Sequence, residues 1–350
     1  MMSKKSLLAF ASLLLLLLGA CSAPAPTQGV TDAPAGGGSS GTLVLYSGRS
    51  EALIQPVIDA FQAQFPNVEI LLKSGNNSEL ANALLEERNN PQADVFITTE
   101  LMTIQSLAQQ DVFEAYRSPA ADQIPNEFIG PDNLWVGLTR RVRVIMYNTD
   151  LVSEAEAPKS IFDLTDPKWR GQLALAGSTN GSMQAQIAAM RQLLGEEATE
   201  SWLTGLIENE ATFFGGHTDV RKAVGAGEFQ VGLVNHYYYY LQKAEGSPVG
   251  IIFPDQEQDQ IGLITNATAV GIIKGTENRP VAEAFVDFLL SEEGQEIFAE
   301  ANYEYPLLSG VSLHPDVQPL DSFRFADVNV GQAAQEIDAT FALMEKVSLP

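Results

Sequence analysis

Residues 43–72 read LVLYSGRSEALIQPVIDAFQAQFPNVEILL and contain a complete strand–helix–strand pattern. The first four residues are β-prone and stop at Ser47 and Gly48. Apolar residues then recur at helical spacing from 51 to 65 on one broad face, and a second β-prone run follows at 68–72. This order of elements predicts an α/β protein with a largely parallel sheet covered by helices on both faces.

The same alternation continues along the chain. Strands are expected at 93–97, 144–147, 171–176, 229–234 and 267–273, and helices around 80–85, from the turn at 178–183 to 194, at 281–290 and again after 291. About 309 residues remain after residue 41, which is long for one core, so two lobes are expected. Ligands of such sheets bind beyond the carboxyl ends of strands, which favours the loops at 46–50 and 98–102.

The N-terminal region predicts sorting and attachment. Lys4 and Lys5 precede an apolar stretch too short to span a bilayer comfortably. The tetrapeptide LGAC that ends at Cys21, the chain's one cysteine, resembles the bacterial lipobox. The resemblance implies that residues 1–20 are a lipoprotein signal peptide and that Cys21 is lipidated; the alternative is an ordinary cleaved signal peptide. Residues 21–41, rich in Pro, Gly, Ala, Ser and Thr, are expected to be a flexible tether.

A lipoprotein signal peptide would place the folded body outside the cytoplasm, on the outer face of the cell membrane or in the periplasm. The chain is strongly acidic, with 20 Lys and Arg residues, 44 Asp and Glu residues and a formal net charge of −24. Such a charge argues against a nucleic-acid partner, and against membrane contact other than through the lipid anchor. It would attract cations, although many extracytoplasmic proteins are acidic without binding metal.

Four consecutive tyrosines, Tyr237 to Tyr240, stand in the stretch GLVNHYYYYLQKAEG. A phenol oxygen is a hard donor, which suits small and highly charged cations. The phenol keeps its proton until about pH 10 in water, but a bound trivalent cation drives the proton off. Adjacent tyrosines therefore suggest a pair of anionic oxygen ligands, above all for ferric iron. The alternatives are a solvated aromatic patch or a helix packed in a core.

Several segments carry a family resemblance. Residues 162–171 (FDLTDPKWRG), 235–238 (NHYY), 285–290 (FVDFLL) and 303–307 (YEYPL) resemble segments of bacterial ferric-iron-binding proteins, the substrate-binding components of ABC importers. The likeness runs from about residue 42 to residue 311. The order and spacing of these segments together make the resemblance specific, although each segment alone is less so.

The resemblance implies a two-lobe fold of the periplasmic-binding-protein type (type II), with the ligand in a cleft between lobes. The lobes would be joined by crossing strands near 140–146 and 265–272. Each lobe would then be discontinuous in sequence: lobe 1 is predicted to comprise residues 42–142 and 268–318, and lobe 2 residues 143–267 and 319–350.

The resemblance also implies a metal site. Tyr237 and Tyr238 match two tyrosine ligands, and Glu100 matches a glutamate ligand from the opposite lobe; the alternative for Glu100 is a solvated loop carboxylate. Ser50 stands where relatives often have a histidine ligand, and the 178–183 turn lacks the tyrosine that some relatives place there. Ferric iron prefers six donors, mostly oxygen. A co-bound anion such as carbonate or phosphate would complete the shell.

An anion site is implied by further matches. Asn180, Gly181 and Ser182 match an anion-holding turn that opens a helix, where free N–H groups suit a negative charge; plain helix capping is the alternative. Asn235 matches another anion-holding position, and His217 falls where an asparagine is common.

Arg49 and three arginines near the predicted crossing are also candidates for the site. Arg49, Arg141 and Arg143, with Arg140 beside them, could neutralise phenolates, lower the pKa of the phenols or grip an anion. They could equally be surface partners of carboxylates.

We therefore expect a monomeric binding protein without catalysis. It would capture ferric iron, close its lobes and deliver the iron to an ABC permease. The alternative is binding of a phosphate-like or organic anion on the same scaffold, with the tyrosines only stacking. No enzyme is expected, since no histidine lies in a triad motif and no Walker or HExxH motif occurs. His236 is expected to point away from the ligand, and Tyr239 and Tyr240 to be core or cleft-wall residues.

Overall fold

The computed structural model describes residues 40–350. The predicted signal peptide, the lipidation at Cys21 and nearly all of the tether lie outside the described residues. Within this range, no helix combines the length and the apolar character that crossing a bilayer requires.

Eleven strands form one mixed sheet over the described residues. They are β1 Gly41–Ser47, β2 Val68–Ser74, β3 Val95–Thr98, β4 Phe113–Glu114, β5 Val136–Asn148, β6 Leu173–Ala176, β7 Thr212–Phe214, β8 Val231–Asn235, β9 Val249–Ile252, β10 Thr265–Ile273 and β11 Tyr305–Pro306.

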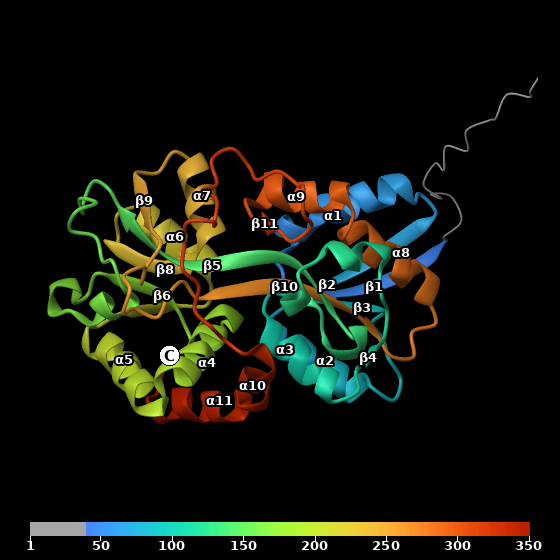
Figure 1. Ribbon diagram of the computed structural model, residues 1–350, viewed down its shortest axis with the longest axis horizontal. Helices are drawn as coiled ribbons and strands as arrows, with labels where there is room; N and C mark the ends of the chain where they lie inside the picture. The colour runs from blue at the N-terminus through green and yellow to red at the C-terminus, as the bar shows by residue number, and fades with distance from the viewer. Residues whose placement is uncertain (1–39) are drawn as a thin grey trace, which may run out of the picture. The chain divides into compact units, whose positions relative to one another are not determined.

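Helices cover the sheet (Figure 1). They are α1 Glu51–Gln64, α2 Asn77–Glu87, α3 Leu101–Gln109, α4 Gly181–Leu194, α5 Glu196–Glu208, α6 His217–Gly225, α7 His236–Ala244, α8 Arg279–Leu289, α9 Glu292–Asn302, α10 Val330–Gln335 and α11 Ile337–Lys346. The predicted helical face at 51–65 is confirmed, because Ile54, Val57, Ile58 and Phe61 of α1 are its buried residues.

The main strand order is β2-β1-β3-β10-β5-β8-β6-β7. On one side β1 pairs in parallel with β2 and β3, and on the other β6 pairs in parallel with β7 and β8. The expected parallel character is thus right within each lobe. It is wrong for the middle of the sheet, where β10 is antiparallel to β3 and β5, and β5 is antiparallel to β8. The reason is that β5 and β10 carry the chain between the lobes in opposite directions.

Strand β5 joins the two lobes. Its first half, to Val142, pairs with β10, and its second half, from Arg143 to Tyr147, pairs with β8. Figure 1 shows β5 and β10 running side by side across the middle of the folded body. The strand predicted at 144–147 is therefore the end of one 13-residue crossing strand.

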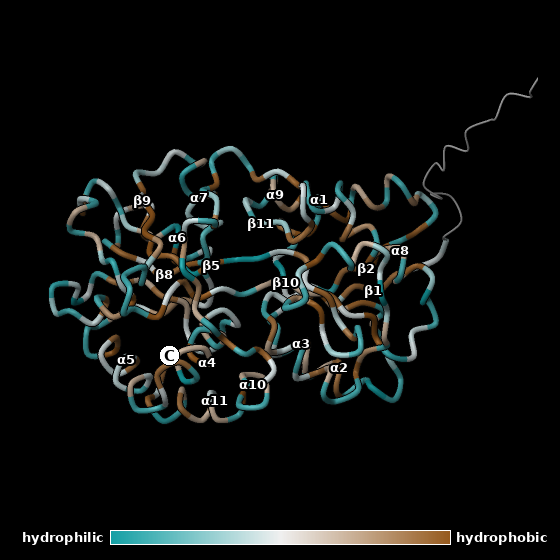
Figure 2. The backbone as a smooth tube through the Cα atoms, viewed as in Figure 1, coloured by the Kyte–Doolittle hydropathy of each residue, from teal (hydrophilic) through white to brown (hydrophobic). Residues whose placement is uncertain are grey.

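Each lobe has its own apolar core. One cluster of buried side chains draws on residues 43–138 and 267–308, and another on residues 145–264 and 326–349. Figure 2 shows that hydrophobic residues, coloured brown, are concentrated along the interior strands of both lobes. A third cluster joins Val142 and Val144 of β5 to side chains of β8, α6 and α7 and to Tyr305 of β11. The α/β two-lobe fold is confirmed, while the lobe boundaries given above stay a prediction.

Candidate functional site

The paired tyrosines open a helix at the carboxyl end of a strand. Strand β8 ends at Asn235, and α7 begins at His236, so Tyr237 and Tyr238 lie in its first turn. Their ring centroids are 4.2 Å apart with an interplanar angle of 32°. Tyr237 is buried and Tyr238 is partly buried. This placement brings two phenols together at the kind of strand end where α/β proteins bind ligands.

Burial raises the pKa of Tyr238 well above its ordinary value, and neighbouring Tyr237 raises it further. Arg141 and Arg49 act in the opposite direction, as expected for cations, but burial outweighs them. The arginines thus lower the phenol pKa as expected, but in the ligand-free protein their effect is smaller than that of burial. Tyr238 keeps its proton at neutral pH, and only a bound cation would displace it.

Arg49 reaches the tyrosines from the loop after β1 and is held by a buried carboxylate. Its Nη1 donates to Oε2 of Glu304 at 3.0 Å, and its Nη2 lies 2.9 Å from Oε1. Nη1 also donates to Oγ1 of Thr268 on β10, and Oγ1 of Thr139 on β5 donates to Glu304 at 2.5 Å. Burial acts to lower the pKa of Arg49, but Glu304 and the two phenols Tyr237 and Tyr238 raise it overall.

Arg143 is buried beside the same phenols among neutral groups. Its Nε donates to Oε1 of Gln186 at 2.7 Å, and its Nη1 donates to Nε2 of His217 at 2.9 Å and to Oδ1 of Asn235 at 3.2 Å. Desolvation, followed by the charge of Arg141, lowers the pKa of Arg143 to about 9. A guanidinium without a carboxylate partner is costly to bury.

His217 cannot compensate this charge. Burial holds its pKa well below the ordinary value, and Arg143 and Arg141 lower it further. The imidazole is therefore neutral, and it accepts the bond from Arg143. Its ring centroid is 5.3 Å from that of Tyr238, so the predicted neighbour His217 does lie at the site.

Glu100 is neither solvated nor free. It is fully buried as the N-cap of α3, where Oε2 accepts from the backbone N–H of Met102 at 2.8 Å and Oε1 from that of Thr103 at 2.9 Å. Burial raises its pKa, while these bonds and Arg141 oppose the rise. Because a carboxylate has about four lone-pair positions, the two cap bonds leave capacity for another partner.

The predicted anion turn is a capped helix start. Oδ1 of Asn180 accepts from the N–H groups of Ser182 at 3.1 Å and Met183 at 3.3 Å. Asn235 joins this turn to the arginines, because its Nδ2 donates to Oγ of Ser182 at 3.1 Å and its Oδ1 accepts from Arg143. Asn180 therefore caps the helix, as the alternative interpretation of this turn expected, and Asn235 connects the turn to Arg143.

The arginine cluster divides between the two faces of β5. Arg141 and Arg143 point to the tyrosine side, where both are nearly inaccessible to solvent. Arg140 points the other way, pairs with Glu127 at 3.4 Å and lies over the rings of Phe128 and Phe325 at 4.7 and 5.2 Å.

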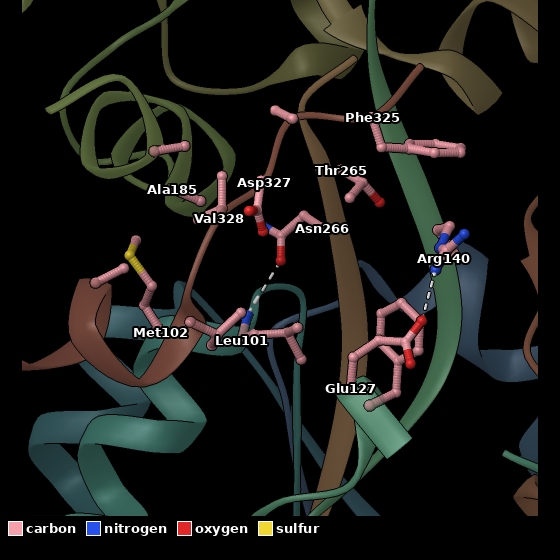
Figure 3. A pocket seen from close by; sticks show the side chains of 15 residues that line it. Leu101, Met102, Glu127, Arg140, Ala185, Thr265, Asn266, Phe325, Asp327 and Val328 are labelled. Carbon is pink, nitrogen blue, oxygen red and sulfur yellow. Dashed lines mark hydrogen bonds and ion pairs between the residues drawn. The ribbon is translucent and has the colours of Figure 1, made fainter. Parts of the chain in front are cut away.

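A separate cavity lies on the side of Arg140. It has a volume of about 450 Å³ and is lined mainly by apolar side chains from both lobes and from the C-terminal segment. Figure 3 shows Arg140 beside Glu127, and Asn266 accepting the bond from the backbone N–H of Leu101. No ligand or anion residue predicted from the sequence is among its lining residues.

The remaining candidates make other contacts. Ser50 is exposed and precedes α1. His236 faces β5 and the C-terminal loop, accepting from the N–H of Val142 and donating to the carbonyl of Tyr303, which agrees with its expected direction. Tyr239 and Tyr240 are buried in the third apolar cluster, as predicted.

Buried donors remain at the site. Nε of Arg49, Nε of Arg141 and Nη2 of Arg143 make no hydrogen bond within the described part of the chain. Residues 40–350 also contain no group of three or more His, Cys, Asp or Glu side chains placed to hold a metal. A metal at this site would therefore depend on phenolic oxygen, and an anion would find N–H groups ready to donate.

Sequence reasoning missed three residues here. Glu304 lies in the recognised YEYPL segment, but nothing local links it to Arg49. Gln186, which receives the bond from Arg143, is one of many helical polar residues. Asn77, which lies against Gly48 and Gly181, is the first residue of α2 after the N-cap Asn76, and nothing local in the sequence indicates a contact between lobes.

Comparison with known proteins agrees with this architecture. Residues 90–329 match the family model described as bacterial extracellular solute-binding protein. Iron uptake protein A1 of Synechocystis is 32% identical over 88% of this chain and 86% of its own length. The Fe(3+)-binding periplasmic protein of Serratia marcescens is 29% identical over 83% of this chain and 86% of its own.

A solved structure of iron-bound HitA from Pseudomonas aeruginosa superposes with a TM-score of 0.81 at 28% identity, over 88% of this chain and 99% of that chain. The match therefore covers both lobes and the crossing strands. The family description indicates a solute-binding protein located outside the cytoplasm. The chain belongs to the bacterial extracellular solute-binding proteins.

Proposed function

We propose that this protein binds ferric iron outside the cytoplasm, together with an anion, and delivers it to an ABC permease. The observation that carries the proposal is the pair of adjacent phenols at the start of α7, with the guanidinium groups of Arg49, Arg141 and Arg143 around it. The iron-binding relatives support it, because they align over most of the chain.

Tyr237, Tyr238 and Glu100 are the proposed protein ligands. Two phenolates and one carboxylate supply three negative charges to a trivalent cation through hard oxygen donors. Glu100 would use the lone pairs that its cap bonds leave free. Ligands drawn from both lobes would favour the closed state whenever iron is bound.

The charges at the site favour a dianion as the co-bound group. Glu304 neutralises Arg49, and the iron is neutralised by its three protein ligands, so Arg141 and Arg143 are left as two positive charges. Carbonate or hydrogen phosphate would balance them. The free N–H groups of the arginines, with Asn180, Gly181, Ser182 and Asn235, would hold the anion.

Ferric titration of the protein tests the metal site. Phenolate bound to ferric iron gives a visible charge-transfer band, so the protein should colour on loading. Tyr237→Phe and Tyr238→Phe should abolish the band, and Glu100→Ala should weaken binding without removing it. Full colour in the double phenylalanine variant would contradict the assignment of the tyrosines.

The free arginine donors also favour a second candidate, the binding of a phosphate-like or organic anion alone. Calorimetric titration separates the two functions. Tight binding of phosphate without iron, and no colour with ferric iron, would favour the anion. Binding of carbonate or phosphate that becomes tight only in the presence of ferric iron would support joint binding.

We also propose that the protein is held at the membrane through lipid on Cys21 and works as a monomer. The sequence motif at the end of the apolar stretch supports the anchor. Cys21→Ser should move the protein from the membrane fraction to the soluble fraction. An unchanged membrane fraction would contradict lipid attachment at this residue.

A further inference from the structure

We propose that Gly181 sets how closely the two lobes can close, because the space of its missing side chain is filled by Asn77 and Glu100 of the other lobe. Gly181 is the first residue of α4 in lobe 2. A Cβ atom at this position would lie 2.7 Å from Nδ2 of Asn77 and 3.2 Å from Cγ of Glu100. Gly181 lies at the site of the proposed function, but its proposed role rests on the contact between the lobes and does not depend on which ligand binds.

Asn77 cannot easily move out of the way. Its Nδ2 donates to Oγ1 of Thr99 at 2.6 Å, and its Oδ1 accepts from the N–H of Thr99 at 3.3 Å. On its other side it packs against Gly48, where a Cβ atom would lie 1.7 Å from Oδ1 of Asn77. The amide is therefore enclosed between two glycines, one in each lobe, and fixed by both of its polar atoms.

Glu100 is fixed as well. Both carboxylate oxygens cap α3 through the N–H groups of Met102 and Thr103. A shift of its Cγ would break these bonds in a fully buried place. An added methyl at Gly181 thus meets two immobile neighbours, and the simplest relief is to keep the lobes apart.

The backbone at Gly181 does not itself require glycine. Its φ lies outside the left-handed region, and it stands in the first turn of a helix, where alanine has the better intrinsic propensity. Alanine should therefore leave the folding of lobe 2 intact. The effect of the substitution should appear in the contact between lobes.

A hydrogen bond between the lobes lies next to this contact. Nδ2 of Asn76 donates to the carbonyl of Thr179 at 2.6 Å, while its Oδ1 caps α2 by accepting from Ser78 at 2.8 Å. Asn76 and Asn77 together thus contact the turn that opens α4. With the lobes in this position, the turn has no room for a side chain at residue 181.

A cysteine trap measures closure without any ligand. Asn76→Cys and Thr179→Cys, in a Cys21→Ser background, should form a disulfide under mild oxidation whenever the lobes meet. Adding Gly181→Ala should slow this reaction about tenfold, the scale of overpacking by one methyl group. Gly215→Ala is the matched control, since a Cβ atom there has no neighbour within 4 Å, and it should leave the rate unchanged.

Equal trapping rates with and without Gly181→Ala, in variants with the same thermal unfolding midpoint, would overturn the inference. Adding Asn77→Ala to Gly181→Ala should recover part of the lost rate, and failure to recover any would also count against it. Ferric iron should speed disulfide formation in the double-cysteine protein that retains Gly181. If it does not, the proposed function is in doubt, while the comparison of ligand-free rates still decides the role of Gly181.

Discussion

Arg49 and Glu304 are 255 positions apart in the chain and form an ion pair in which both side chains are almost inaccessible to solvent. Thr139 and Thr268 bond to this pair from the two crossing strands. The pair therefore ties the loop after β1 and the loop after α9 to the strands that connect the lobes. It also fixes the guanidinium that faces the paired tyrosines.

Removing the carboxylate charge should destabilise the protein. Glu304→Gln leaves Arg49 buried without a counter-ion, and breaking a buried pair in this way typically costs about 3–5 kcal/mol. The free energy of unfolding, measured by urea denaturation of the iron-free protein, should fall accordingly. Glu210→Gln is the control, because the Arg170–Glu210 pair has side-chain exposures of 56% and 64%. The control should change stability by about 0.5 kcal/mol or less.

The two faces of β5 should respond differently to the loss of an arginine. Arg141 lies on the side of Glu100 and Tyr238, whereas Arg140 lines the separate cavity. Loss of a bond from a charged donor is worth about 1.5–3 kcal/mol. Arg141→Gln should therefore weaken anion-dependent ferric binding tenfold or more on this scale. Arg140→Gln should leave it unchanged, and equal losses in both variants would contradict the division of roles.

Iron binding should stabilise the folded protein. A ligand that binds only the native state, at 100 times its dissociation constant, adds about 2.7 kcal/mol to the free energy of unfolding. Scanning calorimetry should show a higher midpoint after ferric loading and a return to the original value after a chelator removes the iron. The Tyr237→Phe, Tyr238→Phe double variant should show neither change.

Much of the fold could be predicted from the sequence because the signals are local. The 43–72 pattern gave the right helix and strands, since apolar periodicity reports directly on a buried face. The antiparallel crossing strands were harder. Residues 136–148 are buried almost throughout, and such a run shows no alternation that would reveal its partners or its full length.

The candidate site divides in the same way. Tyr237 and Tyr238 are neighbours in sequence, so their proximity could be expected, and family resemblance supplied Glu100. The partner of Arg49 could not be found, because Glu304 follows from tertiary packing alone. The raised pKa of Tyr238 could not be predicted from the sequence either, because it depends on how deeply the folded chain buries the phenol.

The four tyrosines should separate into two classes. Tyr239 packs in the third apolar cluster, and Tyr240 belongs to the same cluster while its hydroxyl accepts a bond from the N–H of Gln318 at 3.0 Å. Tyr239→Phe and Tyr240→Phe should therefore keep the full ferric charge-transfer band, in contrast to the same change at the paired tyrosines.

Tyr240→Phe should in addition lower the free energy of unfolding by about 1 kcal/mol, the usual net worth of one hydrogen bond. Urea denaturation checks this loss, and visible titration of the same samples checks the band. A band that disappears with Tyr240→Phe, while Tyr237→Phe retains it, would place the iron on the other side of α7. The burial of the Tyr240 ring, stacked on Tyr303 with centroids 5.7 Å apart, argues against that outcome because a ligand there would have to displace packed core.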